Sequence, residues 1–307
     1  MDCSSRPESR VHEPVLVEEV LGLIDPQPGQ AVVDATLGSG GHAKEILKRI
    51  GKQGRLIGID QDPEAIERAK KNLKEFPQID FVQENFSKLS AILKCLNIET
   101  IDAVIIDTGV STEQLEEPGR GFSFLKEGPL DMRMDPTRSV RARDLIHGLS
   151  QEELGRIFST YGEERWARRI AGAICRERIK GPIETTTKLV EVIKRAVPMR
   201  FHFEPRHPAT RVFQALRIAV NEELAVLEEG LPQVLAALRP GGRLAVIAFH
   251  SLEERIVKRM FREWAARKQV RILTKKPLTP SPEEIQRNPR ARSAKLRAVE
   301  RMLQRVD

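Results

Sequence analysis

The chain has 307 residues, 40% of them hydrophobic and 31% charged, a composition typical of a soluble globular protein with one large or two modest domains and not of a disordered chain. Its formal net charge is +7, a modest excess whose meaning depends on where in the chain it lies. The longest apolar runs, such as residues 244–249, are too short to span a bilayer, and the first residues resemble neither a secretory nor an organelle-targeting signal, so we expect a cytoplasmic protein without a membrane partner.

Short apolar strands alternate with helical patterns over the first third of the chain. The pattern predicts strands at 31–36, 55–60, 81–86 and 101–107, with helices at 41–50, 63–76 and 87–96 between them. Asp62 is a suitable cap for the second helix, and Pro63 suits its first position. This alternation predicts an α/β fold with a doubly wound, mostly parallel sheet.

The alternation stops after Asp107 and resumes about a hundred residues later. Residues 109–143 are rich in Gly, Pro, Asp and Arg, and helical patterns follow at 151–158, 163–178 and 186–197. A long helical pattern then covers 209–238, before a strand at 243–249. We therefore expect an α/β domain made of residues 1–111 and 209–307, with a helical domain inserted at 112–208.

The last part of the chain is basic. A helix is predicted at 252–268 and a strand pair at 270–273 and 294–300, and residues 251–307 hold 16 Lys or Arg against 7 Asp or Glu. Such a skew is compatible with a solvated helix face and a charged tail. Arginines that recur at short intervals also suit bidentate contacts with RNA phosphates, and these are Arg287, Arg290, Arg292, Arg297 and Arg301.

The three cysteines, Cys3, Cys95 and Cys175, are widely separated and match no spacing of zinc ligands. We therefore expect reduced thiols, without a disulfide or a metal site. The sequence does not predict the oligomeric state.

A glycine-rich loop follows the first predicted strand. It contains Gly38, Gly40, Gly41 and His42, and Asp60 ends the next strand. Glycines let a ligand approach the backbone, and a carboxylate at the second strand end can bind ribose hydroxyls, so an adenosine-containing ligand is indicated. The same spacing satisfies the fingerprint of NAD-dependent oxidoreductases, which therefore stay open at this point.

Three features favour S-adenosylmethionine over a dinucleotide. Asp34 stands just before the loop, where a carboxylate would repel a pyrophosphate but suits an ammonium and a sulfonium. Asp107 ends the fourth predicted strand and also suits a cationic ligand. The turn at residues 238–244 resembles the one before the fifth strand of Rossmann-like methyltransferases.

Several longer motifs occur in order along nearly the whole chain, from about residue 11 to 305. They are His12-Glu-Pro-Val-Leu16, the loop Asp34-Ala-Thr-Leu-Gly-Ser-Gly-Gly-His-Ala43, Arg120-Gly-Phe-Ser-Phe124, Gly128-Pro-Leu-Asp-Met-Arg-Met-Asp135, residues 211–222, Phe249-His-Ser-Leu-Glu253 and residues 288–297. Together they closely resemble the ribosomal RNA small subunit methyltransferase H family, also called MraW. The resemblance implies a Rossmann-like methyltransferase fold and methyl transfer from S-adenosylmethionine to the N4 amine of a cytidine, cytosine 1402, in the decoding centre of bacterial 16S rRNA.

The resemblance also implies which residues bind the cofactor. By motif these are Gly40, Gly41, His42, Asp60, Phe86, Asp107 and Gln114, to which the loop itself adds Asp34 and Gly38. We expect Asp60 to hold the ribose and Phe86 to lie against the adenine. Without the resemblance, a core aromatic residue is the favoured interpretation of Phe86, and an ordinary helix-start residue that of His42.

Two departures concern the segment after the fourth strand. The family usually has Asp-Leu-Gly-Val-Ser-Ser, whereas this chain has Asp107-Thr-Gly-Val-Ser-Thr112. Many enzymes that methylate exocyclic amines carry Asp/Asn-Pro-Pro-Tyr at this place, and here both prolines and the aromatic residue are missing. The base must therefore be gripped in another way.

The chemistry requires acceptors close to the reacting amine. A cytosine N4 amine is a weak nucleophile because its lone pair is delocalised, so the enzyme must orient it and accept its protons. Asp107 is the main candidate, and His250 and Ser251 at the end of the fifth strand are secondary ones. For His250 a role in capping the loop is the alternative.

The expected partner is 16S rRNA or the small ribosomal subunit. A stacked base is reachable only once it is unstacked, so we expect the inserted helical domain and the basic tail to hold RNA. Two other functions stay open, a non-catalytic RNA-binding or ribosome-assembly factor and an NAD-dependent oxidoreductase. Intact Asp34, Asp60 and Asp107 argue against the first, and the carboxylate before the loop argues against the second.

Overall fold

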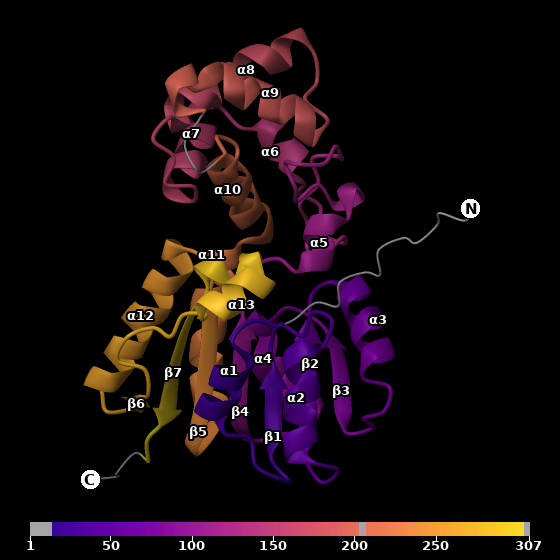
Figure 1. Ribbon diagram of the computed structural model, residues 1–307, viewed down its shortest axis with the longest axis vertical. Helices are drawn as coiled ribbons and strands as arrows, with labels where there is room; N and C mark the ends of the chain where they lie inside the picture. The colour runs from indigo at the N-terminus through magenta and orange to yellow at the C-terminus, as the bar shows by residue number, and fades with distance from the viewer. Residues whose placement is uncertain (1–13, 203–206, 304–307) are drawn as a thin grey trace. The chain divides into compact units, whose positions relative to one another are not determined.

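The computed structural model describes residues 14–202 and 207–303, so Cys3, His12 and Glu13 lie outside the described residues. The chain divides into two compact units (Figure 1), which we call the sheet unit, Met1–Thr108 with Glu228–Asp307, and the helical unit, Gly109–Leu227. The helical unit extends beyond the expected boundary at residue 208, because helix α10 (Thr210–Asn221) packs against α6 (Ala142–Gly148) and α7 (Gln151–Thr160). The two units are described separately below.

In the described residues, the sheet unit forms one seven-stranded sheet in the order β3-β2-β1-β4-β5-β7-β6. Strands β1 to β5 are parallel, and β7 is antiparallel to both of its neighbours, β5 and β6. This confirms the predicted doubly wound, mostly parallel α/β fold. The strands are β1 Ala31–Asp34, β2 Arg55–Asp60, β3 Ile79–Gln83, β4 Ile101–Asp107, β5 Leu238–Ala248, β6 Val270–Ile272 and β7 Lys295–Arg301.

Helices cover both faces of the sheet. Figure 1 shows α1 (Val17–Ile24) and α2 (Gly41–Ile50) in front of the sheet. Their buried side chains join α3 (Pro63–Asn72) in one core with alternate strand residues, such as Val32, Leu56 and Ile105. The remaining helices of the unit are α4 Leu89–Cys95, α11 Glu223–Ala237, α12 Ser251–Ala266 and α13 Pro282–Arg287, with 3-10 helices η1 Phe86–Lys88 and η4 Pro289–Ser293.

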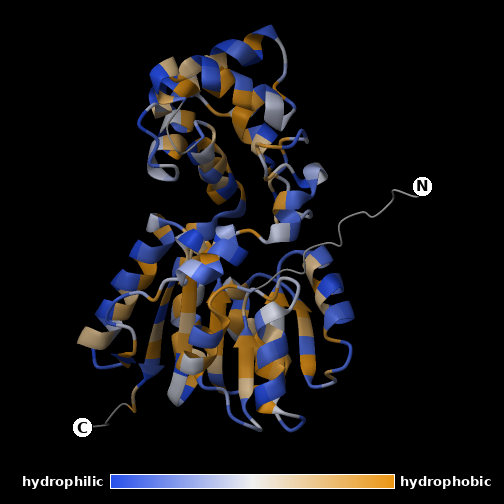
Figure 2. Ribbon diagram, in the orientation of Figure 1, coloured by the Kyte–Doolittle hydropathy of each residue, from blue (hydrophilic) through white to orange (hydrophobic). Residues whose placement is uncertain are grey.

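The central strands are apolar on both faces. Val33, Ile57 and Ile106 are as fully buried as the alternate residues that face α1 and α2. Figure 2 shows the same concentration of hydrophobic residues along the strands. Strands that are covered on both sides read as continuous apolar runs, which is why they could be recognised in the sequence.

The helical unit has its own hydrophobic core. It contains α5 Thr112–Glu116, η2 Pro118–Arg120, α8 Ala167–Lys180, α9 Thr186–Ala196 and η3 Met199–Phe201, in addition to α6, α7 and α10. Phe158, Ile170, Ile174, Leu189 and Leu216 are among its buried residues. No helix in the described residues is long and apolar enough to cross a membrane.

The structure corrects two predicted elements. The helix expected over 209–238 is two helices, α10 and α11, because Glu222 adopts a left-handed backbone conformation with φ of 54°. The strand expected at 81–86 runs instead over Ile79–Gln83, because the Asn85 side chain accepts a hydrogen bond from the Ser87 N–H and starts the 3-10 helix η1. Capping of α3 by Asp62 is confirmed, since its side chain accepts from the Glu64 N–H.

Candidate active site

The loop between β1 and α2 brings backbone N–H groups to the carboxyl edge of the sheet. Gly38 and Gly40 have φ of 54° and 86°, and Gly40 precedes the first residue of α2. A Cβ atom on Gly40 would lie 2.7 Å from Cδ1 of Leu73, so the loop needs glycine there both for its conformation and for its packing. Gly41 and His42 form the first two positions of the helix.

Asp60 fastens this loop to the end of β2. One carboxylate oxygen of Asp60 accepts from the Gly38 N–H at 2.8 Å, and the other accepts from the Asp62 N–H at 2.9 Å. Burial nevertheless raises the pKa of Asp60 to about 6. Since a carboxylate has further lone pairs, Asp60 can also accept hydrogen bonds from a ribose, as the sequence predicts.

The Asp34 carboxylate accepts hydrogen bonds at the N-terminus of α2. Its side chain is 2% exposed and accepts hydrogen bonds from the backbone N–H groups of Thr36 and Ala43. Burial and the charge of Asp60 raise its pKa to about 7. A dinucleotide pyrophosphate binds at this helix end in the Rossmann fold, so a carboxylate in that place is unfavourable for NAD.

Asp107 completes a group of three acids. Burial and repulsion from Asp34 and Glu253 raise its pKa well above the ordinary value. Within the part of the chain that the structure describes, its buried Oδ1 has no hydrogen-bond partner. A buried carboxylate oxygen without a partner beside other acids is costly unless a cation or a hydrogen-bond donor joins it. These acids therefore suit a positively charged ligand with donor groups.

His42 lies next to Asp107. Its Nε2 is 2.9 Å from the carbonyl oxygen of Val15, and its Nδ1 is 3.8 Å from Oδ2 of Asp107. Because a carbonyl oxygen only accepts, Nε2 carries a proton, and in the neutral ring the lone pair of Nδ1 then faces the Asp107 carboxyl group. His42 therefore lies close to Asp107, and its predicted contact with the cofactor stays a prediction.

The end of β5 places His250 in a capping role. His250 precedes α12, and its Nδ1 accepts from the Glu253 N–H at 3.3 Å. Buried Glu253 in turn accepts from the N–H groups of Phe249 and His250. Ser251 is the exposed first residue of α12. The geometry supports the alternative given above for His250, whereas Glu253 was not identified from the sequence, because its spacing from His250 reads only as an ordinary capping pattern.

Phe86 is half-buried and contacts α11. Its ring occupies the space next to Gly230, where an added Cβ would lie 2.5 Å from Cε2 of Phe86. Asn85 before it donates from its side chain to Oε1 of Gln61, which joins the ends of β2 and β3. The proposed contact of Phe86 with adenine stays a prediction.

Gln114 belongs to the helical unit. It is 6% exposed and forms a reciprocal capping box with Ser111 at the start of α5. Its predicted contact with the cofactor stays a prediction.

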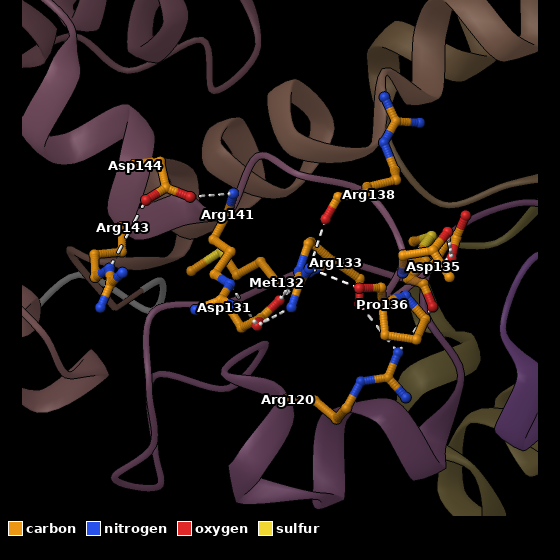
Figure 3. Close-up of polar contacts among 12 residues, drawn as sticks. Arg120, Asp131, Met132, Arg133, Asp135, Pro136, Arg138, Arg141, Arg143 and Asp144 are labelled. Atoms are coloured by element: carbon orange, nitrogen blue, oxygen red, sulfur yellow. Dashed lines mark hydrogen bonds and ion pairs between the residues drawn. The ribbon is translucent and has the colours of Figure 1, made fainter.

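The motif at 128–135 also lies in the helical unit, where it forms a hydrogen-bonded loop (Figure 3). Arg133 pairs with both oxygens of Asp131, at 2.7 and 2.8 Å, while the Arg120 guanidinium donates to the carbonyls of Arg133 and Met134. Buried Asn221 donates to the Met132 carbonyl and accepts from the Met134 N–H. These polar residues hold the loop, and their role could not be read from the sequence.

The basic C-terminal segment divides into two kinds of arginine. Arg297 is 9% exposed and pairs with Glu254. Arg301 donates to the backbone carbonyls of Ala236 and Leu238. These two arginines therefore stabilise the sheet unit and are not available for the RNA contacts that the sequence predicts. Arg287, Arg290 and Arg292 on α13 and η4 are exposed. They stay candidates for RNA contacts.

Comparison with known proteins gives a match over nearly the whole chain. The MraW methylase family matches residues 9–302. A protein of Halothermothrix orenii named ribosomal RNA small subunit methyltransferase H is 46% identical over 307 residues, covering 95% of this chain and 99% of its own. A protein of the same name from Geobacter sulfurreducens is 48% identical, with the same coverage. Among solved structures, an rRNA methylase from Streptococcus thermophilus superposes with a TM-score of 0.43 and 11% identity, covering 94% of both chains.

Proposed function

The chain belongs to the MraW methylase family, and on this premise we propose that it transfers the methyl group of S-adenosylmethionine to the N4 amine of a cytidine, cytosine 1402, in the decoding centre of bacterial 16S rRNA. The names of its relatives support small-subunit rRNA as the substrate. The N4 position and the particular cytidine come from the motif resemblance described above. Because small-subunit rRNA is made and assembled in the bacterial cytoplasm, the protein acts there.

The observation that carries the proposal is the group of buried acids at the strand ends. Asp34, Asp60 and Asp107 all have raised pKa values, and Asp107 has an unsatisfied oxygen within the described residues. S-adenosylmethionine carries a sulfonium and an ammonium, which offset this negative charge, and a ribose, which suits Asp60. A dinucleotide would bring two more negative charges to the same place, so the acids disfavour the oxidoreductase alternative.

The residues of the chain have separate tasks in this reaction. The backbone of the loop through Gly38, Gly40 and Gly41 would hold the methionine end of the cofactor, and Asp60 would hold its ribose. When bound, S-adenosylmethionine supplies an electrophilic methyl group on a positively charged sulfur. The amine nitrogen forms the new bond to this methyl carbon as the carbon–sulfur bond breaks, and one amine proton is released.

Asp107 orients the amine and accepts that proton. Its raised pKa makes it a better proton acceptor than an ordinary carboxylate once it is ionised. A positively charged cofactor nearby favours the ionised form, so cofactor binding and readiness to accept a proton are coupled. The helical unit and exposed arginines such as Arg290 and Arg292 hold the RNA backbone.

Replacing Asp107 tests this assignment. Asp107→Asn keeps the shape of the side chain but can no longer accept a proton, so methyl transfer from labelled S-adenosylmethionine to small-subunit rRNA should fall at least about 100-fold. The melting temperature should not fall, because repulsion from Asp34 and Glu253 is relieved.

Asp80→Asn is the matched control, because Asp80 on β3 pairs with Arg55 and has no part in the proposed site. Its activity should equal that of the unaltered protein. Near-normal transfer by Asp107→Asn would contradict the assignment, and RNA binding without any methyl transfer by the unaltered protein would favour a non-catalytic assembly factor.

A further inference from the structure

Two aromatic rings and two arginines form a cluster on the helical unit, outside the residues discussed so far. The guanidinium carbon of Arg165 lies 4.0 Å from the centre of the Phe201 ring, and that of Arg200 lies 4.8 Å from it. Trp166, which precedes α8, packs against the same ring with a centroid distance of 5.4 Å. Phe201 ends the 3-10 helix η3, so the cluster joins two segments of the unit.

Exposed arginines flank Trp166 and Phe201 in the sequence. Arg168, Arg169 and Arg200 are exposed, and none of them pairs with a carboxylate in the part of the chain that the structure describes. On the same unit, by contrast, Lys180, Lys188 and Arg195 all lie within 3.6 Å of Glu177, which balances part of their charge. The positive charges of Arg168, Arg169 and Arg200 are therefore available to a ligand.

The aromatic residues are also incompletely covered. Trp166 and Phe201 are half-buried, and the neighbouring Met199 is 75% exposed. The indole N–H of Trp166 is buried and has no acceptor among the described residues. A surface that combines partly exposed aromatic rings with arginines that have no carboxylate partner among the described residues, such as Arg168 and Arg200, suits a ligand with flat rings and negative charge.

Single-stranded RNA has this combination of properties. Its unpaired bases stack on aromatic rings and on guanidinium planes, and its phosphates bind arginine. We propose that Arg165, Trp166, Arg168, Arg200 and Phe201 form an RNA-binding surface, the arginine–aromatic surface, that stacks an unpaired base of the substrate RNA and binds the adjoining phosphates. The inference rests on the proposed function, to which it adds a location on the helical unit.

The two tryptophans of the chain allow a direct test of stacking. Trp264 is 6% exposed and packs beside Phe261 in α12, so Trp264→Phe leaves Trp166 as the single tryptophan. Titration of this variant with transcribed 16S rRNA fragments should quench Trp166 fluorescence at the same concentrations at which anisotropy reports binding. Binding without a change in Trp166 fluorescence would overturn the proposal.

Substitutions test the contribution of the surface to affinity. The double variant Arg168→Ala with Arg200→Ala should weaken RNA binding about 10-fold or more at moderate salt. The slope of the logarithm of the binding constant against the logarithm of the salt concentration should decrease by the amount expected for the loss of roughly one to two phosphate contacts. Phe201→Leu keeps an apolar side chain but removes the ring, and should weaken binding about 5-fold or more with little change in the salt dependence. S-adenosylmethionine affinity should stay unchanged in both variants.

Lys188→Ala is the matched control, since it also removes one positive charge from the helical unit, but one that Glu177 already balances. Equal effects of Lys188→Ala and Arg200→Ala, taken as single substitutions, would reduce the result to net charge and contradict the proposal. If the unaltered protein methylates RNA and the surface variants bind RNA normally, the proposed RNA-binding surface is contradicted and the proposed function is not. If the unaltered protein does not bind RNA, both are wrong. If the surface variants lose activity on assembled subunits but bind naked RNA normally, the arginine–aromatic surface contacts a ribosomal protein and not RNA, which would contradict the proposal.

Discussion

Asp34, Asp60 and Asp107 are unfavourable neighbours in a protein without its ligand. Each is a carboxyl group whose pKa is raised mainly by burial, and repulsion from Asp60 acts on Asp34 while repulsion from Asp34 acts on Asp107. A folded protein keeps such a group when the surrounding structure is stable enough and a function requires it. The sequence indicated these three residues because each stands at or near the end of a predicted strand, but it could not show that they repel one another.

Binding of S-adenosylmethionine should depend on pH through these acids. Asp34 has a pKa of about 7 and Asp60 of about 6 in the ligand-free protein, and a cation favours their ionised forms. Affinity should therefore rise as the pH increases from about 5.5 to 8, and binding near pH 6.5 should release protons. Calorimetry in two buffers of different ionisation enthalpy measures both effects. Affinity that is constant with pH, with no proton release, would contradict the account.

The stability of the ligand-free protein should change in the opposite direction with pH. Between the ordinary pKa of 3.8 and its folded value of about 7, Asp34 binds more protons in the folded than in the unfolded state. Its contribution to the free energy of unfolding therefore falls as the pH rises through this window. Asp34→Asn should remove this dependence and stabilise the protein at pH 8, on the order of 2 kcal/mol, relative to the unaltered protein.

Urea denaturation at pH 5 and pH 8 measures this difference. Asp80→Asn, which removes an ion pair with Arg55 away from the acids, should leave the pH dependence as it is. A pH profile of Asp34→Asn that matches that of the unaltered protein would show that Asp34 is not the group that titrates.

Among the elements, the turn between β1 and α2 is the one whose glycines form part of the proposed cofactor site. Gly40 allows the left-handed conformation that starts α2, and Leu73 at the end of α3 fills the space that a side chain would need. The sequence predicted this turn from its glycines alone. It could not predict the close contact with Leu73, because that contact depends on how α3 packs.

Gly40 and Gly241 form a matched pair for testing the turn. Both have positive φ, 86° and 81°, but a Cβ on Gly241 would meet nothing within 4 Å, whereas one on Gly40 would lie 2.7 Å from Leu73. Gly241→Ala should cost only the strain of the conformation, about 1 kcal/mol. Gly40→Ala should cost roughly 2 kcal/mol or more and lower S-adenosylmethionine affinity at least about 10-fold.

Thermal unfolding and calorimetric titration measure these two quantities. Leu73→Ala should restore part of the stability lost in Gly40→Ala, because it removes the clash. Equal costs for the two glycine substitutions would show that packing against Leu73 does not matter.

Asn221 shows what periodicity cannot reveal about an element. The apolar pattern from 209 to 238 predicts one helix, but the chain breaks at Glu222, and the Asn221 side chain just before the break bonds to three backbone groups, the Met132 and Arg217 carbonyls and the Met134 N–H. A polar residue that bonds to a distant loop leaves no periodic trace in the sequence. The same limit applies to Arg133 and Arg120, whose partners are set by the fold of that loop.

Replacing Asn221 should therefore destabilise the helical unit. Asn221→Ala removes the side-chain hydrogen bonds to the Met134 N–H and the Met132 carbonyl, which should cost about 2 to 4 kcal/mol. Amide hydrogen exchange should increase at residues 130–134, while the sheet unit exchanges as before. Gln214→Ala on the same helix removes one hydrogen bond to the Tyr161 carbonyl and should have a smaller effect. Unchanged exchange at residues 130–134 would contradict the assigned role.

For the molecule as a whole, positive charge is less concentrated in the C-terminal segment than its composition suggests. Arg297 and Arg301 make contacts inside the sheet unit, while Arg290 and Arg292 on η4 are exposed. Residue counts could not distinguish these two groups, because both lie within the same short stretch of sequence. The fold class and the position of the three acids at or near strand ends were predictable because each follows from a local pattern, whereas the uses of these arginines depend on tertiary contacts.

Charge reversal should separate the two groups of arginines. Arg290→Glu with Arg292→Glu should weaken RNA binding and flatten its salt dependence while S-adenosylmethionine affinity stays unchanged. Lys52→Glu, an exposed reversal in the turn before β2 at the opposite edge of the sheet, should have a much smaller effect. Binding isotherms at several salt concentrations measure this, and equal loss of both affinities in the double variant would indicate misfolding and not lost RNA contacts.

The position of the transferred methyl group in the RNA tests whether the protein methylates the N4 amine of a cytidine. Unmethylated small subunits or their rRNA, incubated with the protein and isotopically labelled S-adenosylmethionine, can be digested to nucleosides and analysed by mass spectrometry. We expect the label in N4-methylcytidine from the decoding centre, and we expect no such label when Asp107→Asn replaces the unaltered protein. Label in another nucleoside, or no label in the RNA, would contradict it.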